Sequence, residues 1–236
     1  MKIAIMQPYF LPYLGYFSLI KHTEKFILFD TVQFIRHGWI ERNRILKPGS
    51  GWQYIAIPLM KYNQGTKIHD IKIKNTSDWR DKIFRQLEHY KKRAPFYGAT
   101  IDILRAALNI DTDSIVKLNK YVLKTVCDYI GIEINVDVFS EMNLDIEEIK
   151  APDEWALNIC KVLNGINEYW NPEGGLEFFN RSKYENAGID IKFLKMNFSR
   201  YPQRRFEFET GLSIVDVMMF NEPEKINVML DDFVLI

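Results

Sequence analysis

The chain has 236 residues, of which 47% are hydrophobic and 14% aromatic, enough to bury the core of one large α/β domain. Its 31 Lys and Arg residues balance 31 Asp and Glu residues, so no long-range field attracts DNA, RNA or an anionic membrane, and nucleic-acid binding is not expected. No apolar run approaches the ~18 residues of a membrane span or forms a signal-peptide core, which predicts a soluble, cytoplasmic protein.

The first thirty residues predict a strand, a helix and a second strand. Residues 2–6 form a short apolar strand, a proline-bearing turn covers 7–12, and a helix follows over 13–22. Residues 25–30 are a nearly continuous apolar run ending in a carboxylate. Such a run is typical of a strand buried on both faces of a parallel sheet.

A β-rich insertion is expected after the second strand, at about residues 32–74. Within it, residues 42–46 and 52–59 predict a β-hairpin closed by the turn 47–51, which contains Pro and Gly. Residues 66–74, with three isoleucines, predict one more strand.

The rest of the chain alternates helical and strand patterns. Helices are predicted near 79–90, over the apolar stripe from Ile115 to Ile130 with Thr112 or Asp113 as cap and Gly131 as its end, at about 152–163 and 180–187, and at 212–220 and 223–232. Strands are predicted at 134–139, 166–170 and 189–194. This alternation predicts an α/β fold with a Rossmann-like, mainly parallel sheet flanked by helices. The two cysteines lie in the helical patterns and form no CxxC pair, so we expect neither a disulfide nor a metal site.

The turn after the first strand is the first candidate binding segment, because open α/β sheets bind ligands beyond the carboxyl ends of their strands. It offers Gln7, Tyr9, Tyr13 and Tyr16. Neither GxGxxG nor a Walker pattern is present, so no dinucleotide cofactor is expected, although the following helix can present N–H groups to a phosphate. The alternative is a packed aromatic turn.

Asp30, at the end of the second strand, is a further candidate. It follows at the distance where Rossmann-type proteins place an acid for a ribose hydroxyl, or it caps the next turn.

The second candidate segment combines cations, amides and an indole: Gln33, Arg36, Trp39, Arg42, Asn43 and Arg44. Guanidinium groups bind phosphate or carboxylate in a bidentate way, and Trp can cover a sugar or a base. In an extended strand Arg42 and Arg44 share one face and can converge on one anion. The alternative is a solvated hairpin edge.

The third candidate segment lies near the end of the sequence and contains Gln203, Ser213, Asp216 and Asn221. Ser213 is a suitable helix cap with Asp216 at its third position, an arrangement similar to a capping box, and the alternative is that Asp216 or Ser213 reaches the pocket. No GxSxG nucleophile elbow is present. His89 is a further functional candidate. Residues 171–175 (NPEGG) form either a loop that a ligand can approach closely or an ordinary connection.

Four motifs together resemble the WbqC-like family of bacterial proteins: QPYFLPYLGYF, FDTVQFIRHGWIERNRI, WQYIAIPL and the terminal YPQ with LSIVDVMMFN. The resemblance runs from residue 3 to about 222 and implies one WbqC-like domain over 1–236. It also implies that binding or catalytic residues are among those of the three candidate segments: Gln7, Pro8, Tyr9, Gly15, Tyr16, Phe17, Asp30, Gln33, Trp39, Arg42, Asn43, Arg44, Gln203, Ser213, Asp216 and Asn221.

Because members occur in O-antigen and related polysaccharide gene clusters, the resemblance implies a transferase that modifies a nucleotide-linked amino sugar by amino-acid or acyl transfer to its amine. Asp30, His89 and Asp216 are the candidates for the general base. The alternatives are a nucleotidyltransferase-like enzyme, against which the missing HxGH histidines count, and a non-catalytic binding or scaffold protein of the same pathway. The expected partner is a small molecule, a nucleotide-sugar, and the sequence leaves the oligomeric state open, a homo-oligomer included.

Overall fold

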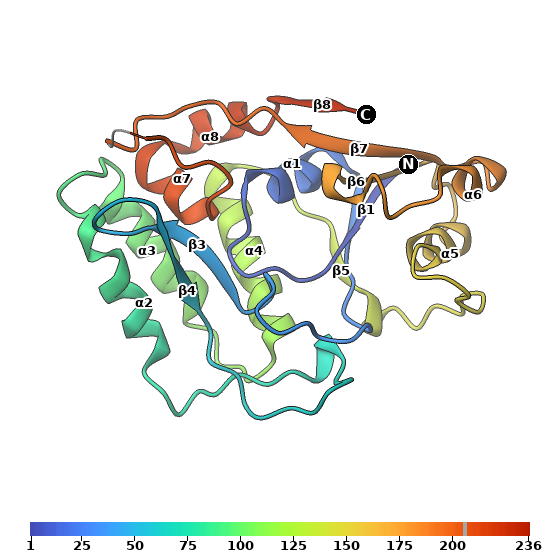
Figure 1. Cartoon of the computed structure of the whole chain (residues 1–236), viewed down its shortest axis with the longest axis horizontal. Helices are drawn as coiled ribbons and strands as arrows, with labels where there is room; N and C mark the ends of the chain where they lie inside the picture. The colour runs from blue at the N-terminus through green and yellow to red at the C-terminus, as the bar shows by residue number, and fades with distance from the viewer. Residues whose placement is uncertain (205–206) are drawn as a thin grey trace.

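A computed structural model describes residues 1–204 and 207–236 of the chain. Within these residues, one six-stranded sheet forms the centre of the fold (Figure 1). Its strands, in spatial order, are β5 (Val136–Val138), β2 (Lys25–Leu28), β1 (Lys2–Met6), β6 (Glu168–Pro172), β7 (Asp190–Met196) and β8 (Phe233–Leu235). The pairs from β5 to β7 are parallel, and β8 pairs antiparallel with β7. The predicted Rossmann-like, mainly parallel sheet is therefore confirmed.

The helices of the described residues are α1 (Leu14–His22), α2 (Trp79–Leu87), α3 (Tyr97–Leu108), α4 (Ile115–Ile130), α5 (Glu154–Val162), α6 (Arg181–Asn186), α7 (Ile214–Phe220) and α8 (Pro223–Met229). Short 3₁₀ turns add η1 (Ile68–Asp70), η2 (Glu88–Tyr90), η3 (Phe139–Glu141) and η4 (Glu173–Gly175). Helix α4 shows how local sequence sets these bounds. The Ser114 hydroxyl accepts a hydrogen bond from the Lys117 N–H at its start, and Gly131 ends it with a left-handed φ of 71°.

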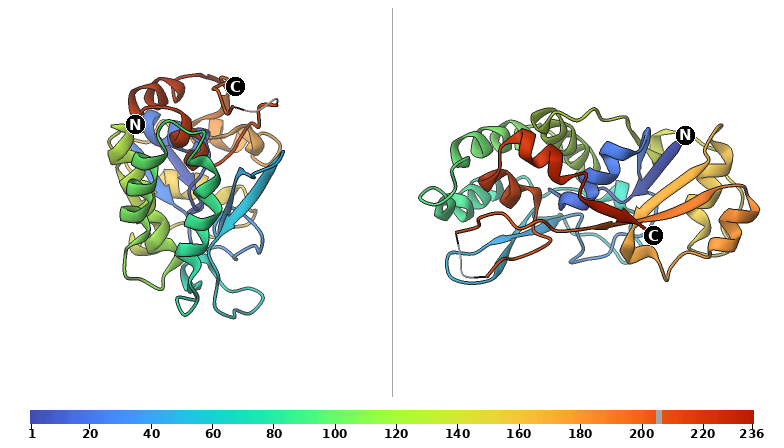
Figure 2. Two further views of the ribbon diagram at one scale, coloured as in Figure 1. Left: turned by 90° about the vertical axis from the view of Figure 1, so that its left-hand side faces the viewer. Right: turned by 90° about the horizontal axis from the view of Figure 1, so that it is seen from above.

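Different helices cover the two faces of the sheet. Successive strand residues point to opposite faces, so Ala4 and Phe26 pack in one buried cluster with α1, α4, α7 and α8, whereas Ile3 and Ile27 pack in another with α5 and α6. Both faces are thus apolar, which explains the nearly continuous apolar runs of β1 and β2. Figure 2 shows the same arrangement from two further sides, with α5 and α6 at the opposite end of the molecule from α2 and α3.

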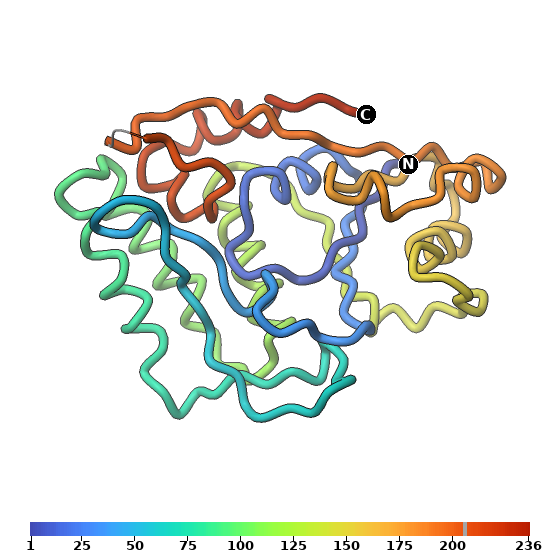
Figure 3. Tube along the Cα trace, in the orientation of Figure 1, coloured from blue at the N-terminus to red at the C-terminus, as the bar shows by residue number. Residues whose placement is uncertain are grey.

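The β-hairpin inserted after β2 is confirmed, and it forms a separate antiparallel sheet. Its strands are β3 (Arg42–Leu46) and β4 (Trp52–Ala56). The chain segment after β7 returns to this hairpin before α7, a path that can be followed along the trace in Figure 3. The Ser213 N–H donates to the Arg44 carbonyl at 2.9 Å, which joins the two segments directly.

The strand predicted over residues 66–74 was wrong. This segment contains η1 and makes isolated bridges to three different partners, Gln33, Leu59 and Ser114, instead of pairing along one strand. Its isoleucines are buried in the main cluster, so they supplied the apolar signal without the continuous ladder that a strand needs.

Two elements were not predicted at all, helix α3 and the edge strand β8. Other bounds moved by a few residues: β4 ends at Ala56, two residues before Pro58, and the helix expected over 79–90 divides into α2 and η2. In the described part of the chain, no helix has the length and apolar character needed to cross a membrane.

Candidate functional site

A cleft of about 1210 Å³ lies at the carboxyl edge of the parallel strands. The strand order reverses between β1 and β6, because β1 leads through α1 to β2 on one side and β5 leads through α5 to β6 on the other. Gln7, which follows β1, and Asn171, near the end of β6, both line the cleft. Ligands of open α/β sheets bind at such a switch point, so the cleft is the candidate functional site.

The cleft wall is mainly aromatic, with amides and few charges. Its aromatic side chains are Tyr9, Tyr13, Phe29, Trp39, Trp155, Tyr169, Phe178, Phe179 and Phe198; its amide side chains are Gln7, Gln33, Asn43 and Asn171; its charged side chains are Arg44, Glu173 and Glu209. The cleft is larger than the ~300–1,000 Å³ of most small-molecule pockets. Such a wall suits a large ligand with ring faces and several hydrogen-bonding groups.

The loop after β1 is held by buried polar contacts. Tyr16 is buried and donates its hydroxyl to the Gln7 carbonyl at 2.8 Å, and the Tyr9 ring packs on the Tyr16 ring at 5.6 Å between centroids. Asn119 of α4, also buried, donates to the carbonyls of Pro8 at 2.7 Å and Ile40 at 2.9 Å. Asn119 was not among the predicted residues, and it joins the first candidate segment to the second.

Tyr13 lies across the first turn of α1. A Cβ atom added to Gly15 would meet Cε2 of the Tyr13 ring at 2.5 Å and its hydroxyl at 2.8 Å, so only glycine leaves room for the ring there. Burial raises the pKa of Tyr13 to about 12, with further contributions from Tyr9 and Glu173. The hydroxyl therefore stays protonated at neutral pH and can donate a hydrogen bond to a ligand.

Arg44 is the cation of the cleft wall. Its guanidinium group lies between two indoles, 5.4 Å from the Trp39 ring centroid and 5.3 Å from that of Trp52, and its Nη2 donates to the Gly211 carbonyl at 3.1 Å. The Nε atom is buried without a hydrogen-bond partner among the described residues. Arg44 is only partly buried, so its other guanidinium donors can bind an acceptor group of a ligand in the cleft.

Arg42 and Arg44 share one face of β3, as expected, but their guanidinium groups meet different rings, and only Arg44 lines the cleft. Arg42 stacks on the Tyr54 ring at 3.9 Å and donates to the His37 carbonyl, and it does not line the cleft. Arg36 is exposed in the preceding turn and also lies outside the cleft wall.

The remaining residues of the second segment do line the cleft. Gln33 is exposed and bridges to Lys67, and Trp39 is partly exposed at the cleft wall. Asn43 is buried, and its side chain donates to the Phe10 carbonyl at 3.0 Å and accepts from the Arg44 N–H at 2.8 Å. Asn43 therefore ties the hairpin to the loop after β1.

Asp30 lies two residues beyond β2 and is almost fully buried. Its Oδ1 accepts from the Ser140 N–H at 3.0 Å and its Oδ2 from the Ser140 hydroxyl at 2.6 Å. These contacts attach the end of β2 to η3, and Asp30 is not part of the cleft wall.

Asp216 is the centre of a buried hydrogen-bond network at the start of α7. Its Oδ2 accepts from the Tyr90 hydroxyl at 2.6 Å, and its Oδ1 accepts from the Tyr201 hydroxyl at 2.7 Å and from Gln203 Nε2 at 3.0 Å. Burial and the nearby Asp216 charge raise the pKa of both tyrosines. Gln203 also bonds to both backbone groups of Glu209, so the network holds the chain that carries this cleft residue.

The other predicted residues of this region cap helices or lie outside the cleft wall. The Ser213 hydroxyl accepts from the Val215 N–H at 3.2 Å, as predicted for a cap, and donates to the Leu11 carbonyl at 2.7 Å. Asn221 is buried at the end of α7 and donates to the Val217 carbonyl at 2.9 Å. His89 lies in η2, and its Nδ1 is 2.8 Å from the Gln86 carbonyl oxygen.

A sequence profile of the WbqC-like protein family matches residues 7–228, nearly the whole chain. The chain belongs to the WbqC-like family. It is similar to the "Uncharacterized protein Rv1507c" of Mycobacterium tuberculosis, with 28% identity over 223 residues that cover 93% of each chain. No solved structure gives a significant match. The family match includes every segment that lines the cleft from Gln7 to Gly211.

Several residues that line the cleft of this WbqC-like protein were not among the predicted site residues. Asn171, Glu173 and Gly175 belong to the NPEGG loop, for which the sequence left open a close ligand approach or an ordinary connection. Glu209 and Gly211 precede α7 and carry no local signal, because they reach the cleft through their contacts with Gln203 and Arg44.

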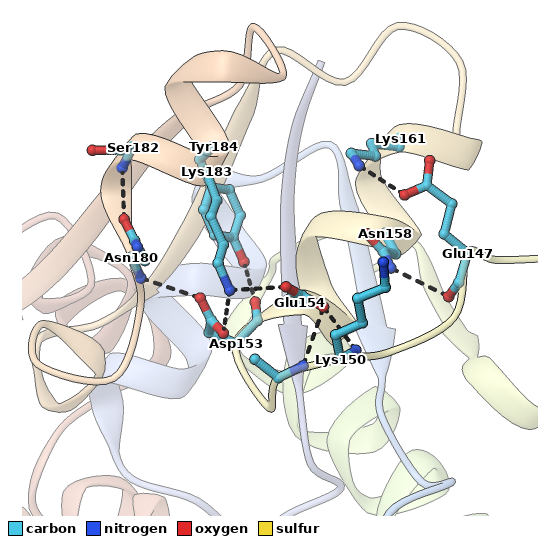
Figure 4. A network of polar contacts seen from close by, with 11 residues as sticks. Glu147, Lys150, Asp153, Glu154, Asn158, Lys161, Asn180, Ser182, Lys183 and Tyr184 are labelled. Carbon is cyan, nitrogen blue, oxygen red and sulfur yellow. Dashed lines mark hydrogen bonds and ion pairs between the residues drawn. The ribbon is translucent and has the colours of Figure 1, made fainter.

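A polar network supports the wall formed by Pro152, Trp155 and Ala156 (Figure 4). Lys183 of α6 pairs with Asp153 at 3.0 Å and with Glu154 at 2.9 Å, at the start of α5. The hydrogen bond from Lys183, with those from the backbone N–H groups of residues 150 and 151, lowers the pKa of Glu154 to about 2. The network fixes the start of α5, and with it the position of Trp155.

Proposed function

We propose that this protein is a transferase of bacterial surface-polysaccharide biosynthesis, of the O-antigen type, that passes an amino-acid or acyl group to the amine of a nucleotide-linked sugar. The observation that carries the proposal is the cleft at the β1–β6 switch point, with an arginine held between two indoles in its wall. Family membership supports the pathway, and the size of the cleft supports two substrates bound together.

The cleft offers distinct groups for each part of such a substrate. Arg44 suits the diphosphate, because its guanidinium group favours negative charge. Trp39 and Tyr9 offer ring faces to the sugar or the base, and Gln7 and Gln33 offer amides to hydroxyl groups. In the reaction the amine nitrogen forms a bond to the acyl carbon, its proton passes to a base, and the leaving group departs with its electron pair.

The binding step is tested by thermal unfolding with a panel of nucleotides and nucleotide-sugars. At a ligand concentration near 100 Kd, binding adds about 2.7 kcal/mol to the unfolding free energy, which corresponds to a rise in Tm of roughly 5–10 °C for a chain of this size. Arg44→Ala should abolish the rise, and Arg42→Ala is the matched control, because its guanidinium group stacks on Tyr54 outside the cleft.

Arg44→Lys is a second variant that controls for misfolding of Arg44→Ala. It keeps the positive charge and loses the planar guanidinium group that forms bidentate hydrogen bonds. We expect it to fold and to bind more weakly than the wild type. The absence of a Tm rise with every nucleotide-sugar in the wild type would overturn the proposal. Transfer itself is tested by mass spectrometry with activated amino-acid and acyl donors. A mass gain on the sugar supports the transferase, and binding without any mass gain favours a ligand-binding protein.

A further inference from the structure

The charged residues of the cleft wall do not match a purely anionic ligand. Among the lining residues that the structure describes, Arg44 is opposed by two carboxylates, Glu173 and Glu209. A carboxylate beside a nucleotide diphosphate is repulsive unless the ligand also carries a positive charge near it. The ligand of this cleft should therefore have a cationic group.

Glu173 is the carboxylate at the switch point. It is the first residue of η4 and follows Pro172, the last residue of β6, whose strand pairs with β1. Its one ion pair in the described chain is with Lys195 at 3.5 Å, and both side chains are about half exposed, so a ligand can replace this weak surface contact.

Tyr13 supplies a second polar group at the same point. Its hydroxyl lies on the first turn of α1, over Gly15, and both Tyr13 and Glu173 line the cleft. Burial, then the charges of Tyr9 and Glu173, raise the pKa of Tyr13, so its hydroxyl stays protonated. The hydroxyl oxygen can accept a hydrogen bond while the carboxylate neutralises a charge.

Glu209 is placed differently. Its backbone is held by Gln203, and its Oε1 lies 3.8 Å from the position of a Cβ atom added to Gly51, in the turn of the β3–β4 hairpin. This carboxylate therefore points toward the hairpin end of the cleft, which makes Glu209 a matched control for Glu173.

We propose that Glu173, with Tyr13 across the switch point, binds the sugar amine as an ammonium group and selects amino sugars over their hydroxyl analogues. This inference rests on the proposed function, because it assigns the residue that recognises the acceptor amine. An ammonium group has N–H donors and a positive charge, whereas the hydroxyl of an analogue has a single donor and no charge to pair with the carboxylate.

The test is isothermal titration calorimetry with UDP-glucosamine and UDP-glucose, which differ in the amine alone, at about pH 6.5, where an amine carries its proton. A second matched pair places the amine on another ring carbon. The wild type should bind the amino sugar roughly tenfold more tightly or better in at least one pair. Glu173→Gln should remove this preference, mainly by weakening the binding of the amino sugar, and Glu209→Gln should keep it.

The outcomes separate this inference from the function on which it rests. Equal binding of both sugars by the wild type, or a preference that survives in Glu173→Gln, overturns the assignment of Glu173 and leaves the nucleotide-sugar site standing. Absence of binding for every nucleotide-sugar overturns both. Glu173 is exposed, so the Glu173→Gln variant should fold normally, as checked by its Tm.

Discussion

Gly15 decides where the Tyr13 side chain lies. In Gly15→Ala the three atoms nearest to the new Cβ all belong to the far end of the Tyr13 ring, so the ring must move while the helix can remain. We expect the variant to fold and to bind nucleotide-sugars roughly tenfold more weakly, a loss of about 1.4 kcal/mol, because the cleft wall at the switch point changes shape. Titration calorimetry against the wild type measures the loss.

Gly98→Ala is the control for this prediction. Gly98 is the second residue of α3, as Gly15 is of α1, and a Cβ atom there meets nothing within 4 Å. The substitution should stabilise the protein by roughly 0.5–1 kcal/mol and leave ligand affinity unchanged. If Gly15→Ala binds ligand as well as Gly98→Ala does, the position of Tyr13 is unimportant for binding.

Single acidic residues show the limit of sequence information at this scale. Asp30 and Asp216 stand at the ends of elements, where an acid can serve a ligand or the fold, and the sequence does not show which groups face it. The partners, Ser140 for Asp30 and Tyr90 with Tyr201 for Asp216, are distant in the sequence. Ser213 is the opposite case, because a cap bonds to its own helix and so leaves a local signal.

Among the elements, α5 forms part of the cleft wall, and its position depends on Lys183 of α6. The pKa of Glu154 is lowered to about 2 from its ordinary value of 4.5. The pairing of Glu154 with Lys183 therefore stabilises the fold fully at pH values above about 4.5, and this stabilisation is lost as the pH falls toward 2. We expect Lys183→Met to lower Tm by a few degrees at neutral pH and to weaken the fall of Tm between about pH 4.5 and 2. Thermal unfolding across this pH range measures both effects.

Lys161→Met is the matched control, since Lys161 of α5 pairs with the exposed Glu147 at 2.9 Å on the surface. Exposed pairs contribute little, so its Tm should stay close to that of the wild type at every pH. A Tm profile of Lys183→Met that follows that of Lys161→Met would show that the contacts of Lys183 do not hold α5.

How well an element could be predicted depended on whether its stabilising contacts are local. Helix α4 carries a long apolar stripe that ends at its terminal glycine, so the helix and its end were predicted, although its cap is Ser114 and not Thr112 or Asp113 as expected. Strand β8 has three residues and is held by pairing with β7, which no local pattern reveals. The segment 66–74 has strand-like residues but contacts three separate partners, so its apolar pattern led to a wrong strand.

At the scale of the whole molecule, the cleft is assembled from segments that are far apart in the sequence. The loop after β1 and the residues around Trp39 could be predicted because topology places strand ends at one edge of a sheet. The contact between Arg44 and Gly211 joins residues 167 positions apart, and no local pattern indicates it. For the same reason, the different partners of Arg42 and Arg44 could not be predicted, since they depend on the rings that each guanidinium group meets.

A ligand that fills this cleft should contact all its segments at once, and hydrogen exchange can show this. Loop amides exchange through local opening, and a bound ligand slows that opening where it makes contact, whereas amides that need global unfolding are slowed throughout the molecule. With saturating nucleotide-sugar we expect slower exchange of the fast amides in residues 7–15, 32–44, 171–179 and 207–211. The fast amides of residues 88–97, which connect α2 and α3 outside the cleft wall, should not change. Arg44→Ala under the same conditions should show no protection. Protection confined to residues 88–97 would place the ligand site away from the switch point, and protection of a single cleft segment would mean that the ligand occupies only a part of the cleft, too little for two substrates to react there.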